Sequence, residues 1–184
     1  MAVPCALHTT GDVACIAARI WAQLHRQEGP GVFVPDDFAA PRSLTGTSES
    51  GVVFRLEPLG LEHNERDYRA WTSSIEHIQR SPGFAERTWP HMMTLKENAS
   101  DLIAHADDFA ARRGFTYTVL GADDAVIGCV YIYPADDGVH DAHVRSWVRA
   151  DHAELDAVLR AAVAEWLRSA WPFTAVRYEG GQNQ

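Results

Sequence analysis

The chain has 184 residues, of which 46% are hydrophobic and 22% charged, the composition of a soluble globular protein. A chain of this length buries a large single core without needing disulfides or a metal. The formal net charge of −9, with no block of Lys or Arg to offset it, argues against a nucleic-acid-binding surface. The sequence shows neither a secretory signal nor an apolar run long enough to span a membrane, which predicts a cytoplasmic protein without a membrane partner.

The three cysteines are Cys5, Cys15 and Cys129. Their odd number and wide spacing match neither a disulfide framework nor a zinc site, and they fit a reducing cytoplasm. Cys129 lies within an apolar run, which favours a buried small hydrophobe over a nucleophile.

The first fifty residues differ in character from the rest of the chain. Apolar residues recur at three- and four-residue spacing over 13–27, which predicts a helix, and Gly29-Pro30-Gly31 ends it. Residues 29–50 are rich in Pro, Gly, Ser and Thr and read as a connector, with one short strand possible at Val32-Phe33-Val34. We therefore expect an N-terminal extension over 1–50 and a second domain over 51–184.

From residue 51 the pattern alternates between strand and helix periodicity. Thr94 and Glu97 have the spacing of a capping box, so a helix is expected to begin directly after Thr94. The turn 121–124 joins two β-rich runs into a hairpin. The expected elements are strand 52–56, helix 65–79, helix 95–112, strands 115–120, 126–133 and 142–149, helix 152–169 and strand 173–178.

This order, opened by Phe54-Arg55-Leu56-Glu57-Pro58-Leu59 and carrying Val126-Ile127-Gly128-Cys129-Val130 in a later strand, resembles the GNAT superfamily of acyl-CoA-dependent N-acetyltransferases. The resemblance covers roughly residues 51–178. It implies a mixed α/β fold in which a twisted mixed sheet is flanked by helices on both faces, here with an N-terminal helical extension and a shortened C-terminus. The alternative is another mixed α/β sandwich.

One region departs from the family's pattern. The family usually places a glycine-rich loop between its fourth strand and third helix, where backbone amides bind the CoA pyrophosphate. The corresponding residues 148–156 contain no glycine and three carboxylates. Asp151 and Glu154 have capping-box spacing, so we expect a self-capped, acidic helix start that repels pyrophosphate.

The strand 142–149 alternates between an apolar face and a polar and aromatic face. The neighbouring strand 126–133 does the same, and the two faces together suggest a pocket for a small anionic or aromatic ligand. The alternative is that these residues lie beneath helices or at a homodimer interface, with Arg145 paired to an acid. The pocket residues expected to bind substrate are Tyr131, Tyr133, Arg145 and Trp147, with His143 beside them.

Acyl transfer needs a base for the amine, and His143 or Asp141 is the candidate. The resemblance implies that Tyr178 protonates the leaving thiolate and that the Val148 backbone amide polarises the thioester carbonyl. Arg149 or another Arg is expected to bind acyl-CoA in place of the missing loop. No metal is expected, because a His-x-x-His spacing on a strand directs the two rings apart.

Two functions follow from these patterns. One is an N-acyltransferase that uses acetyl-CoA or another acyl-CoA as donor and an unidentified small amine as acceptor. The other is a non-catalytic module of the same fold that binds a small ligand or a protein partner. The loop Trp89-Pro90-His91-Met92-Met93 reads as an apolar lid over the helix pair, and in the GNAT superfamily the same loop faces the acceptor.

Overall fold

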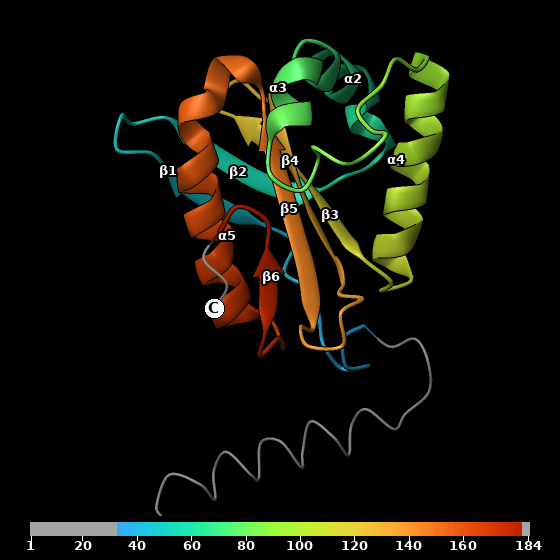
Figure 1. Cartoon of the computed structure of the whole chain (residues 1–184), viewed down its shortest axis with the longest axis vertical. Coiled ribbons are helices and arrows are strands. Elements are labelled where there is room, and N and C mark those ends of the chain that lie inside the picture. The colour runs from blue at the N-terminus through green and yellow to red at the C-terminus, as the bar shows by residue number, and fades with distance from the viewer. Residues whose placement is uncertain (1–32, 182–184) are drawn as a thin grey trace, which may run out of the picture. The chain divides into compact units, whose positions relative to one another are not determined.

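The computed structural model describes residues 33–181 (Figure 1). The helix expected over 13–27 and residue Val32 lie outside the described residues. The elements are β1 (Leu44–Thr47), β2 (Val53–Pro58), η1 (Leu61–His63), α2 (Asn64–Thr72), α3 (Ile75–Arg80), α4 (Leu95–Ala110), β3 (Phe115–Gly121), β4 (Val126–Pro134), β5 (Ala142–Val148), η2 (Ala150–Leu155), α5 (Asp156–Ala170) and β6 (Val176–Tyr178).

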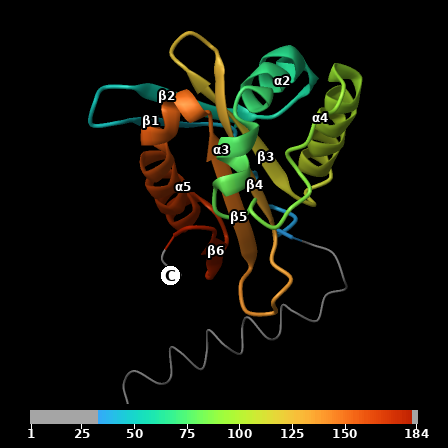
Figure 2. The same ribbon diagram turned by 45° about the horizontal axis from the view of Figure 1, so that its top comes forward.

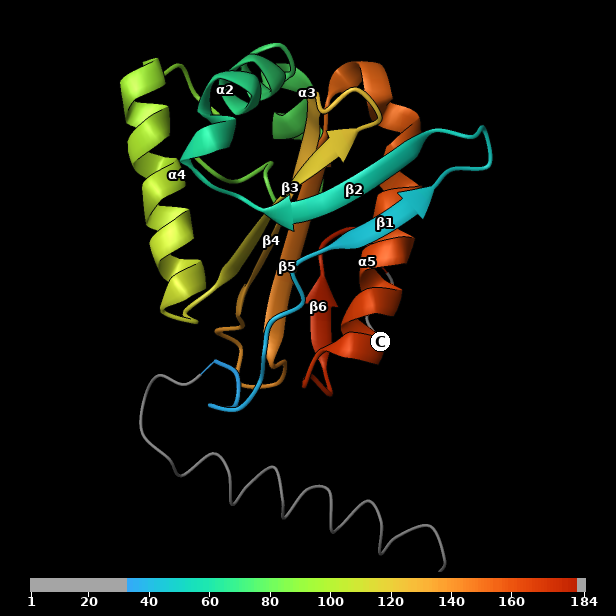
Figure 3. The same cartoon turned by 180° about the vertical axis from the view of Figure 1, so that it is seen from behind.

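The described strands form one six-stranded sheet in the order β1-β2-β3-β4-β5-β6. The first four neighbouring pairs are antiparallel, and β5 and β6 are parallel. Helix α5 covers one face of the sheet, and α2, α3 and α4 cover the other, as Figures 1 and 3 show from opposite sides. This mixed, twisted sheet with helices on both faces confirms the expected architecture.

Alternation along the strands supplies a separate core to each face. Val130 and Val144 face α5 and join the larger core cluster. Cys129, Tyr131 and Trp147 face the opposite way and join a second cluster with residues of α2, α3 and α4. The expected division of β4 and β5 into an apolar face and a polar and aromatic face is therefore confirmed.

Two local predictions are confirmed in detail. Thr94 caps α4, accepting from the Glu97 amide, while the Glu97 carboxylate accepts from the Thr94 amide at 2.7 Å. The hairpin between β3 and β4 turns at Gly121–Asp124, where Asp124 has a positive φ of 61°.

Two elements differ from expectation. The connector over 29–50 contains β1, which pairs with β2, whereas Phe33 and Val34 form no strand. The helix expected over 65–79 is broken into α2 and α3. Thr72 and Ser73 donate their hydroxyls back to the carbonyls of Tyr68 and Ala70, and Ser74 leaves the helical conformation.

The region after β5 also differs. The chain enters a 3₁₀ helix, η2, before α5 begins, and Arg149 rather than Asp151 occupies its N-cap without a side-chain cap bond. The capping box expected between Asp151 and Glu154 is therefore wrong. The Asp151 carboxylate instead accepts hydrogen bonds from the Arg149 guanidinium and from the Nδ1 of His152. The last strand is shorter than expected and starts at Val176.

Gly128 marks a close approach of β4 to β5. A Cβ at this position would collide with the backbone oxygen of Trp147, which no side-chain rotation can relieve. We expect Gly128→Ala to lower the free energy of unfolding by about 1–3 kcal/mol, the usual cost of overpacking. Gly121→Ala is the matched control, because its Cβ would meet the flexible Asp123 carboxylate at 3.3 Å. Equal urea midpoints for the two variants would contradict this prediction.

Candidate functional site

A cavity of about 430 Å³ lies between the sheet and the helices α2 and α4, beside the segment 84–89 that follows α3. Figure 2 shows α3 in front of β4 and β5, with α2 and α4 beside it toward β3. Apolar rings and charged groups share its walls. Its lining includes Leu59, Asp67, Phe84, Trp89, Asn98, Asp101, Leu102, His105, Tyr131 and Arg145.

Arg145 projects from β5 into this cavity and is half-buried. Its guanidinium lies 4.9 Å from the Tyr131 ring centre and 5.8 Å from that of Phe84. No acidic group within residues 33–181 forms an ion pair with it, and its buried Nε has no hydrogen-bond partner there. The alternative in which Arg145 is paired to an acid in the core is therefore not what the described residues show. Burial lowers the pKa of this guanidinium.

Asp67 projects from α2 into the same cavity and is 5% exposed. One carboxylate oxygen accepts from the Asn98 amide at 3.0 Å, and the Asn98 oxygen in turn accepts from Trp71 Nε1 at 2.8 Å. Burial raises the pKa of Asp67 to about 6, against the opposing effect of the Asn98 bond. The group is thus a rigidly held carboxyl that titrates near neutrality.

His105 of α4 forms the third polar wall. The Tyr133 hydroxyl donates to Asp108 Oδ2 at 3.1 Å, so its oxygen is left to accept from His105 Nδ1 at 2.9 Å. The Thr116 hydroxyl oxygen lies 3.2 Å from the same nitrogen and can also accept from it. With the Tyr133 oxygen as acceptor, the His105 proton is assigned to Nδ1, and Nε2 is the unprotonated nitrogen. Burial lowers the pKa of His105, so the ring is neutral at pH 7.

The residues expected to bind substrate take three different positions. Tyr131 and Arg145 line the cavity. Trp147 lies fully buried behind Tyr131 and donates its Nε1 to the Tyr131 hydroxyl at 3.3 Å. Tyr133 reaches the cavity only through His105. Strand alternation predicts all four residues on one face of the sheet, and in the structure two of the four line the cavity.

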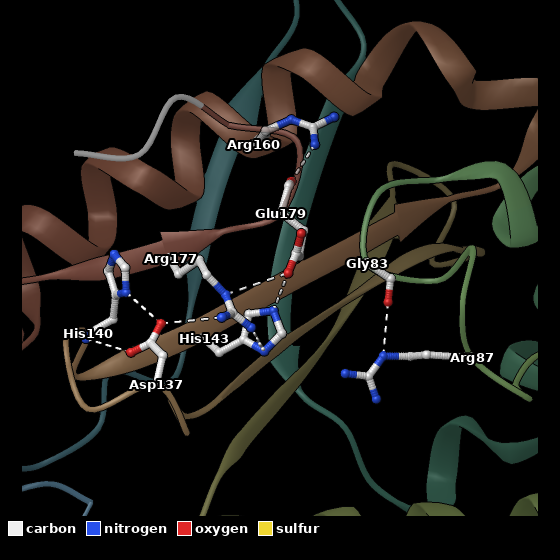
Figure 4. A network of polar contacts seen from close by, with 8 residues as sticks. All are labelled: Gly83, Arg87, Asp137, His140, His143, Arg160, Arg177 and Glu179. Atoms are coloured by element: carbon white, nitrogen blue, oxygen red, sulfur yellow. Dashed lines mark hydrogen bonds and ion pairs between the residues drawn. The ribbon is translucent and has the colours of Figure 1, made fainter.

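His143 lies outside the cavity lining, in a network between β5 and β6 (Figure 4). Arg177 can only donate, so His143 Nδ1 accepts from it and Nε2 donates to Glu179 at 2.6 Å. Asp137 continues the network, accepting from Arg177 and contacting the His140 ring. Burial lowers the pKa of His143 despite the Glu179 bond, and both ring nitrogens are occupied. Its role as a base stays a prediction.

Asp141 and Tyr178 also lie away from the cavity. Asp141 accepts from the backbone amides of Thr174 and Ala175 and so fixes the entry to β6. Tyr178 is buried on the α5 face and donates to Ser146 Oγ of β5 at 2.8 Å. Burial raises the pKa of Tyr178, which keeps the phenol protonated. The catalytic roles of both residues stay predictions.

Among residues 33–181, the second half of β5 has no strand partner on the side away from β4, and we call this side its free edge. Strand β6 pairs with β5 only up to Val144, where the Glu179 amide makes the last bond. Since the Arg149 amide bonds to Ile127 of β4, the amide of the preceding residue, Val148, points away from β4 toward this open side. Gly83 approaches the mouth of the gap, because a Cβ there would lie 2.8 Å from Glu179.

The turn after β5 is already engaged. The backbone amide of Ala150 donates to Ser74 Oγ at 3.0 Å, and Arg149 is paired to Asp151. A phosphate at this position would have to displace a hydroxyl and compete with a carboxylate. The substituted pyrophosphate loop is thus occupied by the protein's own groups.

Cys129 lies outside the cavity lining. Cys129 is buried, and burial strongly raises the pKa of its thiol, as expected for a packing residue. Among residues 33–181, no three His, Cys, Asp or Glu side chains group as metal ligands. None of the helices in this part of the chain is long and apolar enough to cross a bilayer.

The cavity residues that sequence reasoning missed are Asp67, Asn98 and His105. Asp67 precedes Trp71 by one helical turn and therefore lies on the buried face of its helix, where an acid is unusual. That position is a signal available from sequence. His105 and Asn98 offered no such signal, because their importance depends on contacts with Tyr133 and Trp71 from other elements.

The chain matches solved structures, although no protein-family model and no curated protein matches it. Mycobacterium smegmatis RimJ, solved in complex with CoA-disulfide, superposes with a TM-score of 0.58 at 15% identity, over 76% of this chain and 68% of that one. The ribosomal-protein-S5-alanine acetyltransferase of Vibrio fischeri gives 0.51 at 12% identity, over 69% and 68% of the two chains. The GNAT domain of S. lividans PAT gives 0.51 at 14% identity, over 73% and 77%.

Residues 33–181 thus form a mixed sheet with helices on both faces, in which β6 pairs with only the first half of β5 and Arg145 of β5 lines a polar cavity. This is the fold of the GNAT acetyltransferases.

Proposed function

We propose that this protein is a GNAT-like N-acyltransferase that transfers an acyl group from acetyl-CoA or another acyl-CoA to a small amine held in the cavity. The observation that carries the proposal is the position of the cavity. Arg145 and Tyr131 line it, and Arg145 belongs to the strand whose second half has a free edge. Donor and acceptor sites would then lie against the same strand.

The donor side rests on the free edge of β5. A bound acyl-CoA supplies an activated carbonyl as a thioester. The Val148 amide, which points toward the open side, would donate to that carbonyl oxygen and stabilise the charge that develops on it during attack. Arg149 would contact a phosphate after releasing Asp151.

On the acceptor side, His105 is the base that the geometry favours. Its unprotonated Nε2 can take the proton of the amine, while Tyr133 and Asp108 hold the ring orientation through Nδ1. The amine nitrogen bonds to the acyl carbon, the carbon–sulfur bond breaks, and the thiolate takes up a proton. Tyr178 is the proposed donor of that proton, because its hydroxyl reaches Ser146 Oγ on the strand that would hold the thioester.

The alternative is a non-catalytic module of the same fold that binds a small ligand or a protein partner in the cavity. The observation that favours it is the engagement of the turn after β5, where Ser74 and Asp151 occupy the groups that phosphate would need. The two functions differ in whether CoA binds.

A calorimetric titration of the full chain with CoA and acetyl-CoA distinguishes them. We expect weak binding by the native chain and an affinity increase of about two- to fivefold in Asp151→Asn, since removing one negative charge at a helix start is worth about 0.3–1 kcal/mol. Glu154→Gln is the matched control, because Glu154 is exposed on the same turn. Salt should weaken the gained affinity.

Absence of binding by every CoA species, in the native chain and in the variant, would leave the binding module as the function. Tight CoA binding by the native chain that Asp151→Asn weakens would show instead that the carboxylate belongs to the donor site.

A further inference from the structure

We propose that the acceptor bound in the cavity is an amine that also carries a carboxylate, with the carboxylate on Arg145 and the ammonium group on Asp67. This inference deepens the proposed function and rests on it. It follows from the way in which the cavity holds one positive and one negative side chain apart.

The positive wall is built to receive an anion. Arg145 is half-buried and stacked against Tyr131 and Phe84, so its position is fixed before any ligand arrives. It has no acidic partner among residues 33–181, and its Nε is buried without a hydrogen bond. A buried guanidinium donor without an acceptor is costly, and a planar carboxylate satisfies two of its donors at once.

The negative wall is built to receive a cation. Asn98 holds one oxygen of Asp67 by a 3.0 Å bond, and Trp71 and Asn64 fix Asn98 in turn. Among the described residues, no donor contacts the second oxygen of Asp67, which belongs to a side chain lining the cavity. Asp101, exposed on α4, adds negative charge on the same side.

The two walls do not neutralise each other. Within residues 33–181, Asp67 and Arg145 form no ion pair, although both side chains line the cavity. A ligand with a single charge would satisfy one wall and leave the other charge desolvated. A ligand with both charges satisfies both, and the rings of Phe84, Trp89 and Tyr131 contact its carbon framework.

Two further charged groups lie at the rim. Glu86 and Arg87 are exposed, and Arg87 donates to the Gly83 carbonyl at 2.9 Å. Their opposite charges and exposure leave the interior pair, Asp67 and Arg145, to decide which ligand binds.

The experiment is a calorimetric titration of the full chain with a series of ω-amino carboxylates from glycine to 6-aminohexanoate. Each member is compared with its carboxamide, which lacks the negative charge, and with the carboxylate that lacks the amine. We expect at least one member to bind ten or more times more tightly than both of its counterparts. The length of that member measures the separation of the two charged walls.

Two variants assign the effect to the walls. Arg145→Met keeps an unbranched apolar side chain but removes the guanidinium, and it should remove the preference over the carboxamide. Asp67→Asn keeps the Asn98 contact and should remove the preference over the plain carboxylate. Arg168→Met, an exposed position outside the cavity, should change neither preference. Circular dichroism of each variant verifies that it is folded.

Equal binding of each amino carboxylate and its two counterparts, or no binding of any of them by the folded native chain, would overturn the inference. Tighter binding of the carboxamides would overturn it too and would favour a peptide N-terminus. Failure of the proposed function looks different. Selective binding of an amino carboxylate without acyl transfer from acetyl-CoA would support the inferred ligand and contradict the proposed acyltransferase activity.

Discussion

Replacing His105 by Gln should lower kcat/KM for acyl transfer by about 10²–10⁴-fold, the range that a general base contributes. The Gln side chain can still donate to the Tyr133 hydroxyl, so the fold should persist while the basic nitrogen is lost. In the native chain the rate of acyl transfer should fall with decreasing pH through the pKa of His105, which burial lowers below the ordinary value of an imidazole. The variant should lack that acidic limb.

Charged groups around the ring set this pH dependence. Asp101 and Asp108 favour the protonated ring, whereas Arg145 and burial, which is the larger effect, oppose it. His91→Gln is the control, because His91 is exposed and contacts only the Thr88 carbonyl. His143→Gln tests the competing base. A large loss with His143→Gln and none with His105→Gln would assign the proton transfer to the network between β5 and β6.

Asp67→Asn should stabilise the protein above pH 6. The pKa of Asp67 is about 6 in the folded chain against an ordinary value of 3.8, so ionisation opposes folding. This destabilisation is absent below pH 3.8, grows as the pH rises to 6, and is complete above it. At 1.36 kcal/mol for each pKa unit, the difference is on the order of 3 kcal/mol.

Urea unfolding at pH 4, 6 and 8 measures the effect. The native chain and Asp67→Asn should differ little at pH 4 and most at pH 8, because only the native residue ionises. Asp101→Asn, an exposed acid one turn after Asn98, is the control and should change stability by less than about 0.5 kcal/mol. A constant difference between native and variant at all three pH values would refute the linkage.

Local patterns predicted much of the fold. The capping box at Thr94, the hairpin turn at Gly121–Asp124 and the alternation along β5 each depend on residues close in sequence, and all three are confirmed. The break between α2 and α3 was missed because helical periodicity continues across Ser73 and Ser74, although hydroxyl bonds to the backbone interrupt the helix there.

The candidate site was less accessible to such reasoning. Arg145 and Tyr131 were found because strand alternation fixes which face they share. The remaining walls come from α2 and α4, whose positions over the sheet no local pattern specifies. The prediction of a self-capped helix start was wrong for a related reason. The Ala150 amide donates to the hydroxyl of Ser74, a residue 76 positions earlier in the chain.

The order of the strands has a consequence for local opening of the molecule. Strands β1 to β5 pair antiparallel with their neighbours, whereas β6 joins only through three parallel residue pairs after α5. That short ladder is not the only attachment of β6, because Tyr178 packs in the core beneath α5 and donates to Ser146, and Glu179 bonds to His143. Displacing β6 would therefore also disrupt the core on the α5 face, so exposure of the β5 edge is energetically coupled to the stability of the fold.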